Sequence, residues 1–171
     1  MKHLRPVCAG LAVLALAACS SGSDSGGSSG AEHSSTTTES ADATEVAEGL
    51  KSASSTAEKV VTVTEENDPN NLIGRPNGYD SAAIIYDSEI SCDELGSECG
   101  VVVEVFSDES AAQARGEYIQ GILREAPALG SEWDYVKGSV VLRVSGELKP
   151  SSNTTYAEAF GGEQVTVSGT E

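Results

Sequence analysis

The sequence predicts an α+β fold, a two-layer sandwich in which helices pack on one face of a mainly antiparallel sheet. Three observations favour this fold class. Segments with apolar residues every three or four positions occur alongside segments rich in Val and Ile, two pairs of predicted strands follow one another without an intervening helix, and residues 46–171 have the length of one domain. Strands that follow one another directly are typical of antiparallel pairing, because parallel strands need a long crossover.

A short helix leading into a strand is predicted at the start of this domain. Apolar residues from Val46 to Ala57 recur at helical spacing, and Val61 and Val63 then alternate with threonines. The segments 83–86 and 100–106 are rich in Ile and Val, which predicts an antiparallel pair of strands.

A long helix is predicted from a cap at Ser107 to Ala126, just before Pro127. Gly116 and Gly121 permit close packing on the sheet, with a kink as the alternative. The predicted buried face consists of apolar residues at helical spacing, namely Ala111, Ala114, Tyr118, Ile119, Ile122 and Leu123. The predicted outward residues are polar, namely Gln113, Arg115, Glu117, Gln120 and Arg124.

A second hairpin is predicted from 132–136 and 139–144, with its turn at positions 137–138. Trp133 and Tyr135 alternate onto one face of the first strand. Since aromatic residues are scarce in this chain, we expect both in the core rather than at a ligand site.

A last helix is predicted to begin at Pro150, a residue suited to the first helical turn. Tyr156 and Phe160 lie one turn apart in it, and Gly161 is placed to end it. The remaining residues, 163–171, are expected to be a tail or a weak edge strand.

The first 19 residues resemble the leader of bacterial lipoprotein precursors. Lys2 and Arg5 precede an apolar run at 7–16, and the run ends in the lipobox Leu16-Ala17-Ala18-Cys19. The resemblance implies that the Cys19 sulfur receives a diacylglyceryl group, that the leader is cut before Cys19, and that acyl chains hold the chain at the outer face of the cell membrane. An ordinary secretory peptide or an uncleaved N-terminal anchor is the alternative, and either would also place the rest of the chain outside the cytoplasm.

The domain organisation follows from the leader and from composition. We expect a signal peptide at 1–18, a lipidated cysteine with a disordered tether rich in Ser, Gly and Thr at 19–45, and a single α+β domain at 46–171. Together with the unusual segment 68–76, this arrangement resembles uncharacterised small lipoproteins of actinobacteria and their phages. The resemblance implies no particular activity.

Cysteine usage agrees with an extracytoplasmic address. With Cys8 in the leader and Cys19 lipidated, Cys92 and Cys99 remain, which predicts one structural disulfide. A redox pair or a metal site is the alternative. The spacing is wider than in compact redox motifs, and a zinc site would need two further ligands.

The chain is strongly acidic. Its formal net charge is −17, which becomes −19 when Lys2 and Arg5 leave with the leader. This charge argues against nucleic acid and against electrostatic attachment to anionic lipids, and it favours cationic partners or metal ions. Solubility alone is the competing explanation.

The residues needed for common catalytic devices are missing from the predicted domain. The histidine that follows the leader, His33, lies in the predicted tether, so the domain has no base for a Ser-His-Asp or Cys-His device. No phosphate-binding glycine loop occurs either. We therefore predict a protein that is not an enzyme and has no cofactor, with carboxylate chemistry as the remaining catalytic alternative.

Two groups of residues are candidates for binding. The turn-rich segment 67–79 offers a cation in an acidic chain, and its candidate partner-binding residues are Asn70, Asn71, Arg75 and Tyr79. The second group is acidic and surrounds the two cysteines. Its candidate Ca²⁺ ligands are Asp87, Glu89, Asp93, Glu94 and Glu98, although their spacing matches no EF-hand and a solvated acidic loop is favoured.

These observations lead to a functional hypothesis. We expect a non-catalytic binding module at the cell envelope, attached to the bilayer through acylated Cys19 and recognising an envelope protein or ligand. Interference with phage entry, as in superinfection exclusion, would follow if the gene belongs to a prophage. The alternatives are a carboxylate-dependent envelope enzyme and a passive acidic, ion-binding surface protein.

Overall fold

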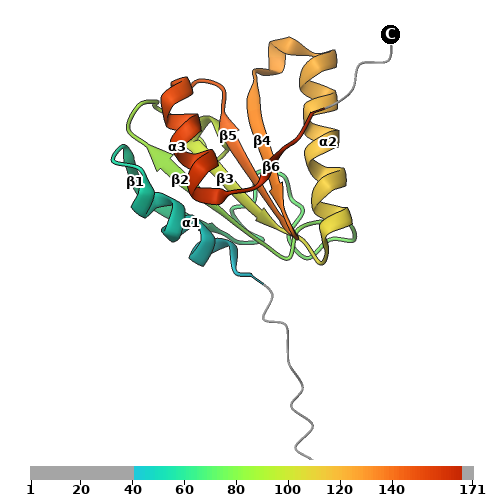
Figure 1. Cartoon of the computed structure of the whole chain (residues 1–171). Coiled ribbons are helices and arrows are strands. Elements are labelled where there is room, and N and C mark those ends of the chain that lie inside the picture. The colour runs from blue at the N-terminus through green and yellow to red at the C-terminus, as the bar shows by residue number, and fades with distance from the viewer. Residues whose placement is uncertain (1–40, 167–171) are drawn as a thin grey trace, which may run out of the picture. The chain divides into compact units, whose positions relative to one another are not determined.

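The computed structural model describes residues 41–166 (Figure 1). The predicted leader, Cys19, the predicted tether up to residue 40 and residues 167–171 lie outside the described residues. The first helix begins at Ala43, so residues 43–45 belong to the folded part rather than to the tether predicted at 19–45. Between residues 41 and 166, no helix combines the length and apolar character needed to cross a membrane. The main elements are α1 (Ala43–Ala53), β1 (Ala57–Val63), β2 (Ser81–Asp87), β3 (Gly100–Val105), α2 (Glu109–Glu125), β4 (Glu132–Lys137), β5 (Val140–Ser145), α3 (Pro150–Phe160) and β6 (Glu163–Gln164).

The strands form one antiparallel sheet in the order β1-β2-β3-β5-β4-β6. The predicted α+β fold, with helices packed against an antiparallel sheet, is confirmed. β1 and the short β6 are the two edges of this sheet. β1 has a β-bulge near its N-terminal end, between Ala57 and Lys59. The side chains of Glu58 and Lys59 are exposed.

The two faces of the sheet carry separate apolar clusters because successive residues of a strand point to opposite sides. α1 and α3 cover one face, as Figure 1 shows, whereas α2 packs against the other, so the helices lie on both faces of the sheet and not on the one face that was predicted. The cluster under α1 and α3 includes Ile85, Val101, Val103, Leu142, Val144, Tyr156 and Phe160. The opposite cluster includes Ile84, Val102, Val141, Val136, Ala112 and Val165.

The face of α2 that packs on the sheet agrees only in part with the predicted one, because Ile119 is buried as predicted but the contact is centred on Gly116. Ala112, Gly116 and Ile119 are buried, whereas Ala114 is exposed and Tyr118 is 61% exposed. The cause is Gly116, where a Cβ would lie 2.8 Å from a methyl carbon of Val165, so the helix approaches the sheet along its glycine. The predicted close packing therefore occurs at Gly116 and not at Gly121. The spacing of apolar residues could not identify a glycine as the centre of this contact.

Two further details of α2 and the hairpin correct the predictions. Asp108, not Ser107, caps α2, since its carboxylate accepts the Ala111 N–H at 2.9 Å. The hairpin turn falls at Gly138-Ser139, one residue later than predicted, and Gly138 has the positive φ of 56° that such turns require.

The remaining predictions for the C-terminal half are confirmed. Tyr135 is buried, and Trp133 packs against the cluster under α1 and α3. α3 begins at Pro150 and ends at Gly161, whose φ of 66° is the left-handed conformation of a helix C-cap. The first residues after α3 form the edge strand β6, which pairs with β4.

Candidate functional site

A pocket of about 170 Å³ lies on the sheet face opposite α1 and α3, between two loops. We call residues 64–80 the crossing loop, residues 88–99 the disulfide loop, and the space between them the inter-loop pocket. Strand residues supply an apolar floor, the two loops supply the walls, and Arg143 of β5 lies at one end. The lining residues are Val63, Pro69, Asn70, Tyr79, Ala82, Ile84, Glu94, Leu95, Gly96, Ser97, Glu98, Val102 and Arg143.

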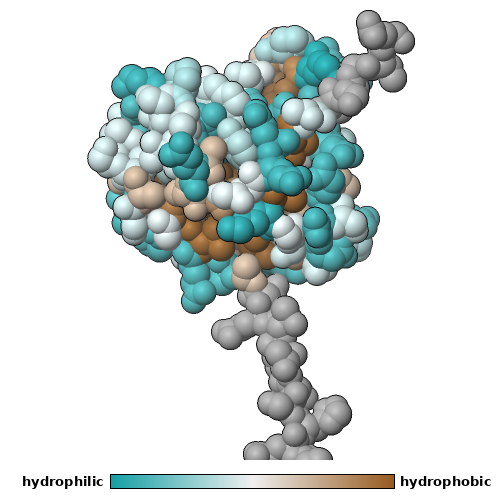
Figure 2. Space-filling view, in the orientation of Figure 1, coloured by the Kyte–Doolittle hydropathy of each residue, from teal (hydrophilic) through white to brown (hydrophobic). Residues whose placement is uncertain are grey.

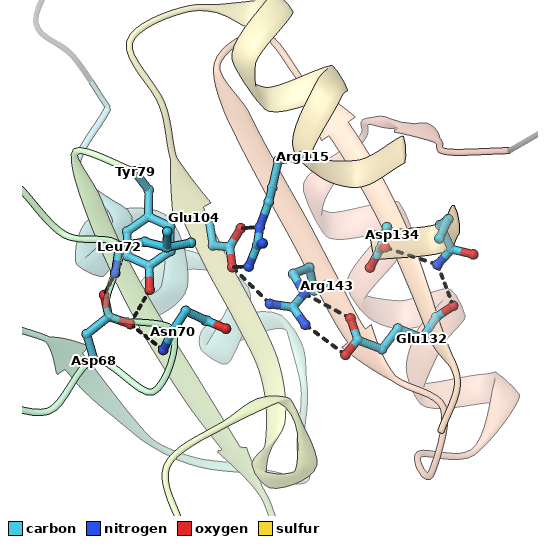
Figure 3. A network of polar contacts seen from close by, with 10 residues as sticks. Asp68, Asn70, Leu72, Tyr79, Glu104, Arg115, Glu132, Asp134 and Arg143 are labelled. Carbon is cyan, nitrogen blue, oxygen red and sulfur yellow. Dashed lines mark hydrogen bonds and ion pairs between the residues drawn. The ribbon is translucent and has the colours of Figure 1, made fainter. Parts of the chain in front are cut away.

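Asp68 holds the crossing loop in place. Its carboxylate accepts the N–H groups of Asn70, Leu72 and Ile73 at 2.9, 2.6 and 2.9 Å, and it also accepts the hydroxyl of buried Tyr79 (Figure 3). Burial alone would raise the pKa of Asp68, but these hydrogen bonds lower it below its ordinary value. Burial and the bond to Asp68 raise the pKa of Tyr79. The wall that carries Asn70 is therefore ordered by the hydrogen bonds to the half-buried carboxylate of Asp68.

A covalent bond holds the opposite wall. Cys92 and Cys99 form the predicted disulfide, with Cα atoms 5.0 Å apart. Closing a loop of this length stabilises a fold by about 2–3 kcal/mol on the chain-entropy model. Gly96 also lines the pocket, and a Cβ there would lie 2.3 Å from a carboxylate oxygen of Glu98, so the Glu98 side chain would have to shift to make room for it. Hydrogen bonds to Asp68 thus hold the crossing loop, whereas a disulfide holds the disulfide loop.

Arg143 connects the pocket to a buried charge network between the sheet and α2 (Figure 3). Its Nη1 donates to Glu104 Oε1 at 2.9 Å, and its Nε and Nη2 donate to the two carboxylate oxygens of Glu132, each at 2.9 Å. Arg115 of α2 binds Glu104 from the other side, through Nε at 2.8 Å and Nη2 at 3.0 Å. Glu104 is 0% exposed and Arg143 only 8% exposed, so these charges are paired in the protein interior.

The charged state of the network is set by its ion pairs. Burial alone would raise the pKa of Glu104, but Arg143 and Arg115 lower it. Burial would lower the pKa of Arg143, yet Glu104 and Glu132 raise it. Both groups are therefore ionised, and Arg143 reaches the pocket with its charge compensated by two carboxylates.

Asp134 of β4 is the exception in this network. It is 0% exposed; its Oδ2 accepts from Gln120 Nε2 at 3.0 Å, and its Oδ1 has no hydrogen-bond partner. Burial, reinforced by the nearby charge of Glu132, raises the pKa of Asp134 to about 7. Asp134 does not line the inter-loop pocket.

The structure divides the predicted partner-binding residues. Asn70 and Tyr79 line the inter-loop pocket, whereas Asn71 and Arg75 are exposed outside it, with Arg75 Nη2 donating to Asn71 Oδ1 at 3.0 Å. Arg75 instead borders a wider hollow of about 720 Å³ beside α2, together with the exposed Tyr118.

The predicted acidic group is divided as well. Glu94 and Glu98 line the pocket, and Asp93 is exposed in the same loop. Asp87 is buried on the other face, where its Oδ2 accepts the hydroxyls of Tyr156 at 2.7 Å and Thr56 at 2.8 Å. Glu89 is the remaining member of the group. Its carboxylate accepts hydrogen bonds from the side chains of Lys149 and Ser152, each at 2.9 Å. Within residues 41–166, no three His, Cys, Asp or Glu side chains are grouped so that they could hold a metal ion.

Sequence reasoning did not identify the charge network. Arg115 and Gln120 were predicted to face outward because polar residues on a helix usually do. The available signal was Glu104, a single acid in the middle of a Val-rich strand. Because strands with apolar residues on both faces are buried on both faces, an acid there needs a buried cationic partner.

The arrangement is suited to binding a small group with an apolar body and a positive end. The floor is apolar, the exposed carboxylates of Glu94 and Glu98 line the pocket, and the charge of Arg143 is already neutralised by Glu104 and Glu132. No protein-family model matches the chain, and no similar protein was found among the curated proteins or among the solved structures. The chemistry of the site therefore has to be argued from its own residues.

Proposed function

We propose that the protein is a lipid-anchored, extracytoplasmic lipoprotein whose folded domain is a non-catalytic binding module for a basic segment of an envelope protein. The lipobox at Leu16–Cys19 supports the anchor, and a disulfide between Cys92 and Cys99 suits an oxidising compartment. The observation that carries the binding role is the inter-loop pocket, whose two walls are each ordered before any ligand arrives. Such preorganisation reduces the entropy lost on binding.

The chemistry of the pocket favours a lysine side chain as the group bound. A lysine has an aliphatic stem and a terminal ammonium. Val63, Ile84 and Val102 offer apolar surface to the stem, and Glu94 and Glu98 offer carboxylates to the ammonium. The formal net charge of −17 also attracts a basic partner at a distance.

A titration with acetyl-lysine-methylamide, followed by ¹H–¹⁵N NMR of the full chain, tests this assignment. We expect the amides of Asn70, Gly96 and Val102 to shift. The uncharged norleucine analogue should shift them far less, because it has the same stem without the ammonium. Exposed carboxylates contribute about 0.2–1 kcal/mol each, so Glu94→Gln with Glu98→Gln should weaken binding roughly fivefold to tenfold.

A matched double variant distinguishes the effect of the pocket carboxylates on affinity from the effect of the overall negative charge of the protein. Glu117→Gln with Glu125→Gln removes the same two charges from the exposed side of α2 and should leave the affinity within twofold. Equal shifts with lysine and norleucine compounds, or equal weakening by both double variants, would refute the lysine assignment.

The anchor is tested separately in the native cells. We expect the wild-type protein in the membrane fraction and Cys19→Ala in the soluble or secreted fraction, since the acylated sulfur is the proposed attachment. Mass spectrometry of the N-terminal peptide should find acyl chains on Cys19. Equal membrane retention of both forms would contradict lipidation at this residue. Proximity cross-linking of the two forms would then identify proteins captured only by the anchored one.

A carboxylate-dependent enzyme is the second candidate, and Asp134 is the observation that favours it. A carboxyl group with a pKa near 7 is suited to acid–base work. However, Asp134 is fully buried and lies outside the inter-loop pocket, so a substrate would have no direct access to it from there. The binding module is therefore the preferred function.

A further inference from the structure

A second pocket lies on the opposite face of the sheet, between α1 and α3 near the turn that joins β4 to β5. We call it the α1–α3 pocket; its volume is about 370 Å³. Figure 2 shows apolar surface exposed between these helices. It shares no lining residue with the inter-loop pocket, so it is a separate site.

The walls of the α1–α3 pocket are apolar. Leu50 of α1, Val140 of β5 and Phe160 of α3 are buried members of the core cluster on this face, and Val46 packs against the same cluster. The pocket is thus a surface hollow whose lining is mostly apolar and belongs to this core cluster. An occupant would gain contact with side chains that are already fixed by packing.

Lys137 is the charged residue among those that line this pocket. Its Nζ donates to the Phe160 backbone oxygen at 2.9 Å and lies 6.0 Å from the centre of the Phe160 ring. These contacts hold the ammonium beside the apolar opening, and an ammonium has three donors. Among the residues that line this pocket, Lys137 is therefore the group that can pair with an anion.

We propose that the α1–α3 pocket binds the alkyl chain of a fatty carboxylate, with the carboxylate paired to Lys137. Ligand pockets for small molecules measure about 300–1,000 Å³, and this one is at the lower end of that range, which suits one chain rather than two. The apolar walls of the pocket would contact the alkyl chain of the ligand. The Lys137 ammonium explains why the head group of the ligand would be negatively charged. This site is independent of the lysine-binding role proposed for the other face.

Gly49 makes the proposal directly testable. It lines the pocket from α1, and a Cβ built on it meets no atom within 4 Å. Leucine at this position has room for its Cβ and adds an apolar side chain to the lining of the pocket, and it favours a helix more than glycine does. Gly121 in the middle of α2 is a matched control, because a Cβ there also meets no atom within 4 Å.

The experiment is a titration of the full chain with dodecanoate below its micelle concentration. It uses Cys19→Ser as the parent, so that no attached acyl chain competes, and it reads displacement of a fluorescent fatty acid. We expect saturable binding at one site, at least tenfold weaker in Gly49→Leu and unchanged in Gly121→Leu. Lys137→Met should weaken dodecanoate about fivefold and leave binding of dodecanol unchanged.

Other outcomes would overturn the proposal. Equal binding by Gly49→Leu and the parent would place the alkyl chain elsewhere. Equal affinity for dodecanoate and dodecyltrimethylammonium would remove the role of Lys137. Binding to phospholipid vesicles without binding to dodecanoate would assign the pocket to a membrane surface instead.

Discussion

Replacing Glu104 with glutamine should lower the free energy of unfolding by about 3–5 kcal/mol, the usual cost of removing one partner from a buried ion pair. Glu104 is fully buried and binds both Arg115 and Arg143. In the variant, Arg115 would lose its carboxylate partner and Arg143 would keep only Glu132. Urea unfolding followed by the fluorescence of Trp133, the single tryptophan of the chain, measures the difference.

The control for this prediction is Glu125→Gln at the end of α2. Glu125 is exposed, and the substitution removes the same charge without emptying a buried pair. We expect its stability to stay within about 0.5 kcal/mol of the parent. A Glu104→Gln protein as stable as the Glu125→Gln protein would mean that the charge network does not hold α2 to the sheet.

Asp134→Asn should raise stability at pH 8 by about 2–4 kcal/mol and leave it nearly unchanged at pH 4. Burial and Glu132 raise the pKa of Asp134 from 3.8 to about 7, even though Gln120 and Arg143 act in the opposite direction. Between these two values the folded protein holds a proton that the unfolded chain has released. Stability therefore falls as the pH rises from about 4 to about 7, and above that the whole cost of the buried charge is present.

Parent and variant must be compared at each pH, because other carboxylates contribute in the opposite sense. Asp68 and Glu104 have lowered pKa values, so their contributions are lost at acidic pH. Subtracting the two unfolding curves at pH 4, 6 and 8 isolates Asp134. A difference that does not change with pH would show that Asp134 is ionised throughout or neutral throughout this range.

Local rules predicted the elements well where one residue determines the backbone. Pro150 and Gly161 mark the two ends of α3 because proline suits the first turn and glycine suits the left-handed cap. Alternation placed Trp133 and Tyr135 on the core face of β4. Helix ends and strand faces depend on residues that are close together in the sequence, so they can be predicted without knowledge of the tertiary structure.

The candidate sites depend on contacts between distant segments, and this explains what was missed. The inter-loop pocket requires Asn70 of one loop and Glu98 of the other to line the same hollow, although each loop was recognised separately. The predicted buried face of α2 included Ile119 correctly but missed Ala112 and Gly116, because the closest contact is made by Gly116, a residue without a side chain. Periodicity measures side chains and does not detect such a contact.

The edges of the sheet have a consequence for a protein held in the plane of a membrane, as we propose. Copies confined to one surface meet often, and an open strand edge would let them join by strand addition. β1 is interrupted by its bulge and presents exposed Glu58 and Lys59, while β6 at the other edge is only two residues long. We therefore expect crowded copies to stay separate, so that the pockets on both faces remain open to their ligands.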